Sequence, residues 1–150
     1  DDRESLDKIT ASSEFTWLHI MNAIRKFRQA TNNTRYWREK NNEENLRTQQ
    51  LYGKTIGIIG YGRIGKNVSK YATSFGMNYK FYDPGVFGNG NKVSSIKSMK
   101  DVDIVSINCG LNDTSRNLIT YDTFKDFKKV DKKIIEMVNA WKATAQNIKY

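Results

Sequence analysis

The stretch from residue 54 to residue 84, "KTIGIIGYGRIGKNVSKYATSFGMNYKFYDP", is the most regular part of this 150-residue sequence. Its first apolar run, Thr55 to Ile59, is rich in β-branched residues and is typical of a strand buried in a parallel sheet. Arg63 to Ser74 places apolar residues on one helical face, and Gly76 stands where such a helix would end. Asn78 to Tyr82 predicts a second strand. The stretch therefore predicts a strand, a turn, a helix and another strand, in that order.

The turn after the first strand has the spacing G-x-G-x-x-G, formed by Gly60, Gly62 and Gly65. In this arrangement the first glycine permits a tight turn, the second lets a pyrophosphate approach the backbone, and the third lets the helix pack close to the strand. Asp83 follows about 20 residues later, where a carboxylate accepts hydrogen bonds from ribose hydroxyls. A carboxylate there repels a 2′-phosphate, so the pattern predicts a site for NAD rather than NADP.

A glycine turn that only packs a helix on a strand is the alternative interpretation. The second strand and Asp83 match the dinucleotide-binding pattern as well, and they favour a working site. The helix that starts at Arg63 would direct its free amides toward the phosphates. The backbone amide of Arg63 therefore matters more for binding than its side chain, which on its own suits a solvated helix start.

The sequence before this stretch predicts an amphipathic helix over "TASSEFTWLHIMNAIRKFRQA", residues 10–30, with apolar residues spaced three and four apart. Thr10, Ser12 or Ser13 would cap its amino end, and Glu14 suits its first turn. A second, more polar helix is expected from Thr34 to Lys40. The polar residues 40–54 then predict a connector.

After the stretch, the sequence predicts a short helix at Ile96–Lys100, a strand at Asp101–Asn108, a helix at Tyr121–Lys129 and a strand at Lys133–Asn139. Strands that alternate with helices favour an α/β fold in which crossover helices cover a parallel sheet. We therefore expect a helical lead-in and connector over residues 1–50. Residues 51–150 are expected to form part of a Rossmann-type, three-layer dinucleotide-binding domain.

The net charge of the chain is +9, from 25 Lys and Arg against 16 Asp and Glu. Such a charge suits nucleic-acid binding, but these basic residues are spread along the sequence, so a diffusely basic surface without a nucleic-acid site is favoured. The single cysteine, Cys109, excludes an internal disulfide and a cysteine-rich zinc site, and it fits a reducing compartment such as the cytoplasm. The apolar runs are too short to span a bilayer, so no membrane association and no metal site are predicted.

With these residues identified, the chain resembles the D-isomer-specific 2-hydroxyacid dehydrogenases. The resemblance runs from about Ile9 to Asn139 and covers less than half of a whole family member. It is carried by four segments: "SSEFTW" (residues 12–17), "LYGKTIGIIGYGRIGKNV" (51–68), "YDP" (82–84) and "DVDIVSINCGLNDTSRNLI" (101–119). They are similar to the start of the family's long helix, its glycine-turn signature, its ribose-binding acid and its third-strand segment.

The resemblance implies NAD as the cofactor and a set of residues that bind it. The amides of Arg63 and Ile64 would face the pyrophosphate, Asp83 would hold the ribose, and the residues after the third strand would pass along the adenosine and the nicotinamide ribose. Cys109 is expected to be a small wall residue there, since no base activates its thiol. The full set of expected cofactor-binding residues is Gly60, Tyr61, Gly62, Arg63, Ile64, Gly65, Asp83, Asn108, Cys109, Gly110 and Thr114.

The chain departs from the family at the residues expected to carry the chemistry. The family follows its fourth strand with Asn-x-x-Arg-Gly, where the arginine binds the substrate carboxylate. Here Lys142 stands at the arginine position and is the single catalytic candidate, although lysine lacks the two-pronged grip of a guanidinium. The family's catalytic histidine and glutamate would fall beyond this sequence. The one histidine, His19, lies in the first helix and is expected to be an ordinary helix residue.

Two functions therefore stay open at this point. The first is the cofactor domain of an NAD-dependent dehydrogenase that acts on the CH–OH group of a D-2-hydroxy acid, in a chain that is expected to be inactive alone. The second is a non-catalytic dinucleotide-binding module or remnant, which the replaced arginine favours. Family members dimerise largely through the cofactor domain and its long helix, so the resemblance also implies a homodimer.

Overall fold

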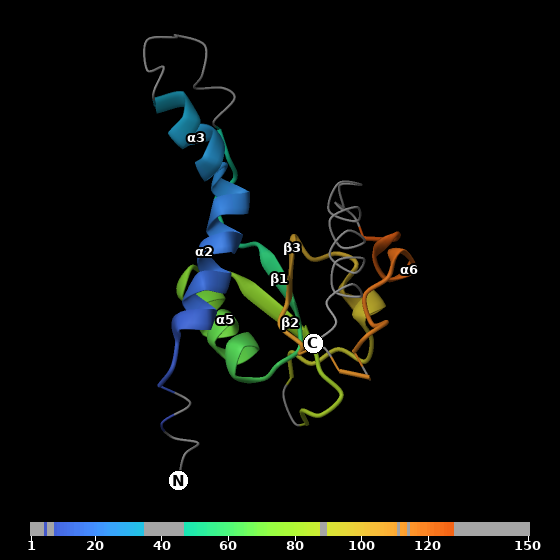
Figure 1. Ribbon diagram of the computed structural model, residues 1–150. Coiled ribbons are helices and arrows are strands. Elements are labelled where there is room, and N and C mark those ends of the chain that lie inside the picture. Colours follow the sequence, from blue (N-terminus) through green and yellow to red (C-terminus); the bar gives the residue numbers. More distant parts are fainter. Residues whose placement is uncertain are drawn as a thin grey trace, which may run out of the picture.

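The computed structural model describes residue 5 and residues 8–34, 47–87, 90–110, 112–113 and 115–127. Within these residues three strands form one sheet, with helices on both sides of it (Figure 1). The elements are α2 (Ala11–Arg25), α3 (Phe27–Thr34), β1 (Thr55–Ile59), α5 (Arg63–Ser74), β2 (Asn78–Tyr82), the 3-10 helix η1 (Ile96–Met99), β3 (Ile104–Ile107) and α6 (Tyr121–Phe124).

The sheet is parallel, and β1 lies in its centre in the order β2-β1-β3. Thr55 of β1 is paired with Asn78 of β2, and Ile56 is paired with Ile104 of β3. Parallel neighbours require crossover connections, and α5 makes the connection from β1 to β2. The predicted α/β fold with a parallel sheet and three layers is therefore confirmed.

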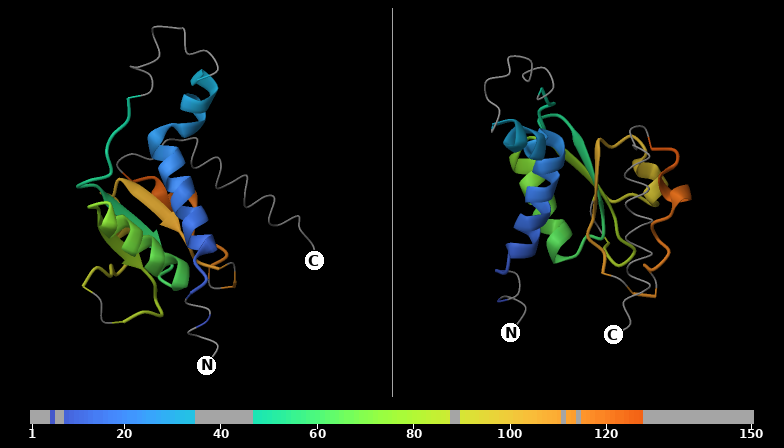
Figure 2. Two further views of the ribbon diagram at one scale, coloured as in Figure 1. Left: turned by 90° about the vertical axis from the view of Figure 1, so that its left-hand side faces the viewer. Right: turned by 45° about the horizontal axis from the view of Figure 1, so that its top comes forward.

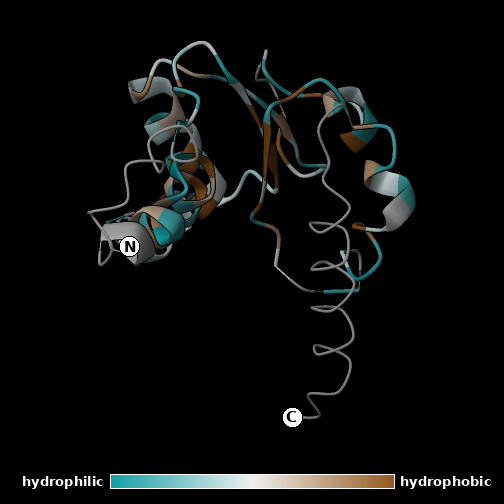
Figure 3. Cartoon of the chain, turned by 90° about the horizontal axis from the view of Figure 1, so that it is seen from above, coloured by the Kyte–Doolittle hydropathy of each residue, from teal (hydrophilic) through white to brown (hydrophobic). Residues whose placement is uncertain are grey.

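Each face of β1 packs against a different layer, as the two views of Figure 2 show. Ile56 and Ile58 belong to a core cluster with residues of α2 and α5, while Ile59 belongs to a second cluster with residues of η1 and α6. All three isoleucines have no exposed surface. Burial on both faces explains why β1 is a nearly continuous apolar run, and brown, hydrophobic strand segments lie between the two layers in Figure 3.

Gly57 lets the second layer approach β1 directly. A Cβ atom at this position would lie 3.0 Å from Sδ of Met99 and 3.1 Å from Cγ2 of Val102. These distances are tighter than ordinary van der Waals contact, so the side chains of Met99 and Val102 occupy the space that a side chain at position 57 would need.

The amino-terminal helix α2 packs along α5, on the same side of the sheet. The Trp17 ring lies 6.0 Å from the Tyr71 ring and 5.2 Å from the Phe75 ring, measured between centroids. Ser13 is buried at the contact, and its Oγ accepts a hydrogen bond of 3.2 Å from Nδ2 of Asn67. Aromatic and polar contacts thus join the lead-in helix to the helix that follows the glycine turn.

The single helix predicted over residues 10–30 is wrong in one respect, because it is interrupted at Lys26. Lys26 adopts a left-handed conformation with φ 50° and ends α2, and α3 begins at the next residue. The apolar residues of α2 that pack against the core extend as far as Ile24, whereas Phe27, the first residue of α3, is 56% exposed. Beyond Ile24 the core therefore offers little packing that would favour a straight helix.

The other predicted elements agree in position where the structure describes them. The third strand is shorter than predicted, at Ile104–Ile107, and the short helix at residues 96–100 is a 3-10 turn. The helix predicted at Tyr121–Lys129 is described only as Tyr121–Phe124. Most of the helix predicted at 34–40 and the strand predicted at 133–139 lie outside the described residues. Within the described part, no helix is both long enough and apolar enough to cross a membrane.

Replacement of Ile58 by Ala should lower the free energy of unfolding by about 2–5 kcal/mol, because it removes a fully buried side chain from the core. The matched control is Ile107→Ala in β3, where the side chain is 44% exposed and the loss should stay below about 1 kcal/mol. Urea unfolding followed by circular dichroism measures both. Equal losses in the two variants would contradict the burial of β1.

Candidate cofactor site

The glycine turn lies at the carboxyl edge of the sheet, between the ends of β2 and β3. The Gly60 amide donates to the Tyr82 carbonyl oxygen at 2.9 Å, and the Asn108 amide donates to the Ile59 carbonyl oxygen at 2.7 Å. Gly60 has φ +89°, and a Cβ atom there would lie 2.6 Å from the backbone nitrogen of Cys109. Both the conformation and the space require glycine at this position.

Gly65 and Gly62 have different roles in the turn. A Cβ atom on Gly65 would lie 2.2 Å from the carbonyl oxygen of Gly60, so α5 crosses β1 too closely for any side chain. A Cβ atom on Gly62 would meet nothing within 4 Å. Gly62 precedes the first residue of α5 and has no side chain that caps it. The amino end of α5 therefore adjoins open space at Gly62, and the amino end of a helix is where a pyrophosphate binds in such turns.

The Asp83 carboxylate lies beside this turn and is held by two backbone amides. Its Oδ2 accepts from the Tyr61 amide at 2.7 Å, and its Oδ1 accepts from the Gly85 amide at 2.8 Å. Each carboxylate oxygen has a further lone pair, so the group keeps acceptor capacity for a ligand hydroxyl. The sequence thus places a fixed anion next to the amides of α5, at the end of the neighbouring strand.

The end of β3 forms the other wall of this edge. Asn108 is paired with Ser106 through Nδ2 and Oγ at 3.1 Å, and Gly110 accepts from the Ser115 hydroxyl at 2.6 Å. Burial raises the pKa of the Cys109 thiol, and the negative charge of Asp83 raises it further. Cys109 is therefore a protonated, partly buried thiol at neutral pH, and its role as a wall of the cofactor site stays a prediction.

The structure brings most of the expected residues together. Gly60 through Gly65, Asp83 and the residues 108–110 all meet at this one edge of the sheet. Thr114 and the catalytic candidate Lys142 lie outside the described residues. His19 lies on α2 with its ring edge-on to Phe15 at 4.4 Å, in the layer that covers one face of the sheet.

Two side chains have contacts that the sequence did not indicate. The Arg63 guanidinium, expected to be solvated, donates to the carbonyl oxygen of Ile9 and so ties the start of α5 to the start of α2. Tyr61, expected among the cofactor-binding residues, is 7% exposed and packs its ring on Phe81 of β2. Contacts of this kind depend on the packing of three elements, so spacing along the sequence carries no signal for them.

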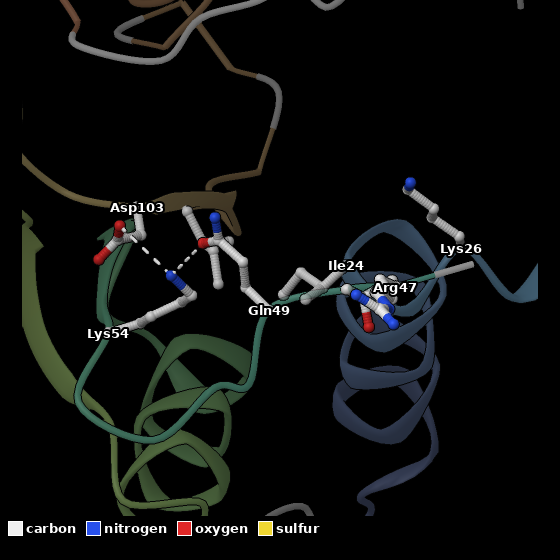
Figure 4. A pocket seen from close by; sticks show the side chains of 8 residues that line it. Ile24, Lys26, Arg47, Gln49, Lys54 and Asp103 are labelled. Atoms are coloured by element: carbon white, nitrogen blue, oxygen red, sulfur yellow. Dashed lines mark hydrogen bonds and ion pairs between the residues drawn. The ribbon is translucent and has the colours of Figure 1, made fainter. Parts of the chain in front are cut away.

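A concave region with a volume of about 360 Å³ lies at the opposite, amino edge of the sheet (Figure 4). Its central amine, Lys54 Nζ, donates to Oε1 of Gln49 at 2.6 Å and lies 3.9 Å from Oδ1 of Asp103. Lys26 and Arg47 line the far side and do not converge on that amine. Ligands of parallel sheets bind at the carboxyl ends of the strands, so the amino edge is a structural junction between the connector and the sheet.

The observed turn fits a dinucleotide, since the space at Gly62 is open, α5 begins at the next residue and the Asp83 carboxylate is bonded to the turn at Tyr61. These features define a Rossmann-type dinucleotide-binding domain. Residues 17–137 match the family described as "D-isomer specific 2-hydroxyacid dehydrogenase, NAD binding domain". The chain belongs to this family, as its resemblance predicted.

Similar proteins agree with this assignment. The chain is 32% identical to a glyoxylate reductase of Aeropyrum pernix over 130 residues, which cover 79% of this chain and 39% of the relative. Among solved structures, the TT0316 protein of Thermus thermophilus superimposes with a TM-score of 0.71 at 25% identity, covering 79% of this chain and 39% of that protein. An NAD⁺-bound 3-phosphoglycerate dehydrogenase of Entamoeba histolytica gives 0.57 at 26% identity, covering 75% and 33%. The chain therefore spans well under half the length of these relatives.

Gly65→Ala should lower the free energy of unfolding by about 3 kcal/mol or more, because the new methyl group would meet the backbone oxygen of Gly60 at 2.2 Å. Gly62→Ala is the matched control and should cost less than about 1 kcal/mol, since its φ of −75° suits alanine and the space is open. Urea unfolding measures both variants. In the folded Gly62→Ala protein, titration with NADH should show weaker binding, because the methyl group occupies the pyrophosphate space. A Gly65→Ala protein as stable as wild type would contradict the close crossing of α5 and β1.

Proposed function

We propose that this chain binds NAD at the carboxyl edge of its sheet and serves as the cofactor domain of a D-2-hydroxyacid dehydrogenase. The observation that carries the proposal is the open space at Gly62, flanked by the amino end of α5 and by the Asp83 carboxylate. The amides of Arg63 and Ile64 would hold the pyrophosphate, and Asp83 would accept from the adenosine ribose hydroxyls. Asn108, Cys109 and Gly110 would line the path of the rest of the cofactor, together with Thr114.

The chemistry that NAD supplies when bound is hydride transfer to or from a substrate carbon. The residues described here bind and orient the cofactor, and the Asp83 charge would disfavour a 2′-phosphate at the ribose. In the whole protein the reaction would interconvert a 2-hydroxy acid and a 2-oxo acid. This proposal is supported by family membership and by the relatives named above.

We further propose that the 150-residue chain alone binds the cofactor without catalysing the reaction. An acid/base group must reach the proton that it transfers, and the one histidine, His19, lies on α2 beside Phe15. Lys142 at the family's arginine position lacks the planar fork that grips a carboxylate. The alternative of a non-catalytic dinucleotide-binding module shares these observations, and it differs in having no dehydrogenase activity even in a longer protein.

Domain organisation and self-association also belong to the proposal. We place a helical lead-in over residues 1–50 and the cofactor domain over 51–150, with α2 docked on α5 through Trp17. Phe15 and Leu18 of α2 are 61% and 51% exposed. An exposed apolar face on the long helix supports the homodimer that the family resemblance implies.

Asp83→Asn should weaken NADH binding by about tenfold, because hydrogen bonds to a charged acceptor are stronger than those to a neutral one. It should also reduce the preference for NADH over NADPH, because the charge that repels a 2′-phosphate is lost. Asp113→Asn makes the same change of charge on a side chain that is 98% exposed, and it should leave both affinities unchanged. Isothermal titration calorimetry measures the dissociation constants. In the wild type, NADH at about 100 times its dissociation constant should also add about 2.7 kcal/mol to the free energy of unfolding.

Alkylation of Cys109, the single cysteine, provides a second measure of NADH binding. It should be slower with NADH than without it, because this residue lies at the same edge of the sheet as the proposed site. A wild-type chain that neither binds millimolar NADH nor is stabilised by it would refute the proposal. DNA binding that weakens with salt, in the absence of any response to NADH, would favour a nucleic-acid function instead.

The chain alone should show no oxidation of NADH with a panel of 2-oxo acids, followed by absorbance at 340 nm. Lys142→Arg should leave that result unchanged, since an arginine restores substrate binding without supplying a general acid. The same preparation must bind NADH by calorimetry, so that a negative result reports missing chemistry rather than an unfolded sample. Turnover above the no-enzyme rate in either protein would show that this chain contains a complete active site.

A further inference from the structure

The residue between the first two glycines of the turn, Tyr61, is part of the core although it stands in a loop. Its ring stacks on the Phe81 ring with centroids 3.8 Å apart and planes 15° apart. It also lies parallel to the Tyr79 ring at 6.1 Å, with planes 10° apart. Tyr79 and Phe81 are alternate residues of β2 and therefore lie on the same face of that strand. Tyr61 thus continues a row of aromatic rings along β2.

The far end of the Tyr61 side chain is also fixed. Its hydroxyl oxygen lies 3.0 Å from Oγ of Ser69 on α5 and 3.3 Å from the Tyr79 hydroxyl oxygen, and its single proton is donated to one of these two partners at a time. Ser69 in turn donates to the Lys66 carbonyl oxygen at 2.8 Å, within the same helix. Burial raises the pKa of the Tyr61 phenol, so the hydroxyl stays protonated near neutral pH and keeps these partners. The side chain consequently joins the turn to both α5 and β2.

The backbone of the same residue contacts the ribose-binding acid. The Tyr61 amide donates to Oδ2 of Asp83 at 2.7 Å, while the ring of Tyr61 packs on Phe81, two residues before Asp83 in the sequence. Rotation of the turn about the Phe81 contact would therefore move the amide away from the carboxylate. The aromatic contact and the amide contact constrain the same two segments.

We propose that Tyr61 is a positioning residue. Its packed ring holds its own backbone amide in hydrogen-bonding contact with Asp83, and this contact orients the remaining lone pairs of the carboxylate toward the cofactor ribose. This inference rests on the proposed binding of NAD at the same edge. It goes further by assigning discrimination at the ribose to a core aromatic contact as well as to the acid. A tyrosine that only fills the core would lower stability without changing this discrimination.

A double-mutant cycle separates these two roles. Tyr61→Leu should weaken NADH binding by about tenfold and lower the ratio of NADH to NADPH affinity, since Asp83 loses its fixed orientation. In an Asp83→Asn background the same Tyr61→Leu change should alter NADH affinity by less than about twofold, because the charged acceptor has already gone. Calorimetric titration at a temperature where each variant is folded, verified by circular dichroism, gives the four dissociation constants for each nucleotide.

Two further variants complete the test. Tyr61→Phe keeps the stacked ring, so it should bind NADH within about threefold of wild type and retain the preference for NADH. Phe124→Leu removes a buried ring from the second core cluster, which does not include Tyr61, Tyr79 or Phe81, and should lower stability with both affinities unchanged. Tyr61→Phe keeps the inference testable even where Tyr61→Leu does not fold.

Three results would overturn the inference while leaving the proposed function intact. They are an equal cost of Tyr61→Leu in both backgrounds, a Tyr61→Leu protein with the nucleotide preference of wild type, and a Tyr61→Phe protein that has lost this preference. Failure of the wild-type chain to bind NADH at all would instead refute the proposed function. The two failures are therefore distinguishable within one set of titrations.

Discussion

The contact between Gly65 and the carbonyl oxygen of Gly60 holds the central strand, the helix α5 and the cofactor edge in one arrangement. A Cβ atom on Gly65 would lie only 2.2 Å from that oxygen, so α5 crosses β1 too closely for any side chain at this position. On its other side Gly60 lies close to the backbone of Cys109, just after β3, where a Cβ atom on Gly60 would be 2.6 Å from the Cys109 nitrogen. The ends of β1 and β3 and the start of α5 therefore converge on one glycine, and the open space at Gly62 follows from this convergence.

Much of this arrangement could be predicted from the sequence, because it depends on local signals. The apolar run at Thr55–Ile59, the glycine spacing and Asp83 predict a strand, a phosphate-binding turn and a ribose acid, and the structure places them at one edge of a parallel sheet. Backbone geometry dictates these residue types, so their order along the chain is sufficient. The family resemblance extended the prediction to the segment after β3 as part of the site, and in the structure Cys109 of this segment lies against Gly60.

The features that could not be predicted depend on tertiary packing. The break at Lys26 arises where α2 runs past the core, and nothing in the periodicity of residues 10–30 marks that point. The burial of Tyr61 depends on the Tyr79 and Phe81 rings of β2 and on the hydroxyl of Ser69 on α5, which the crossover from β1 to β2 brings together. Arg63 likewise finds its partner in Ile9, at the far end of the lead-in helix. The local sequence pattern thus predicts which residues belong to the candidate site, and tertiary packing determines the contacts that fix their side chains.

The missing side chain at position 57 has a consequence for how this domain evolves. Gly57, Met99 and Val102 share one small volume between β1 and the η1 layer, because a Cβ atom on the glycine would come within 3.0 Å of the methionine sulfur. Substitutions at these three positions are therefore not independent, and a gain in volume at one must be offset by a loss at another. We therefore expect a change in volume at one of these positions to be accompanied by a compensating change at another in related sequences, although the three residues lie in the core and not in the glycine turn. Sequence change in this domain is thus constrained by the packing between β1 and η1 as well as by the residues at the binding edge.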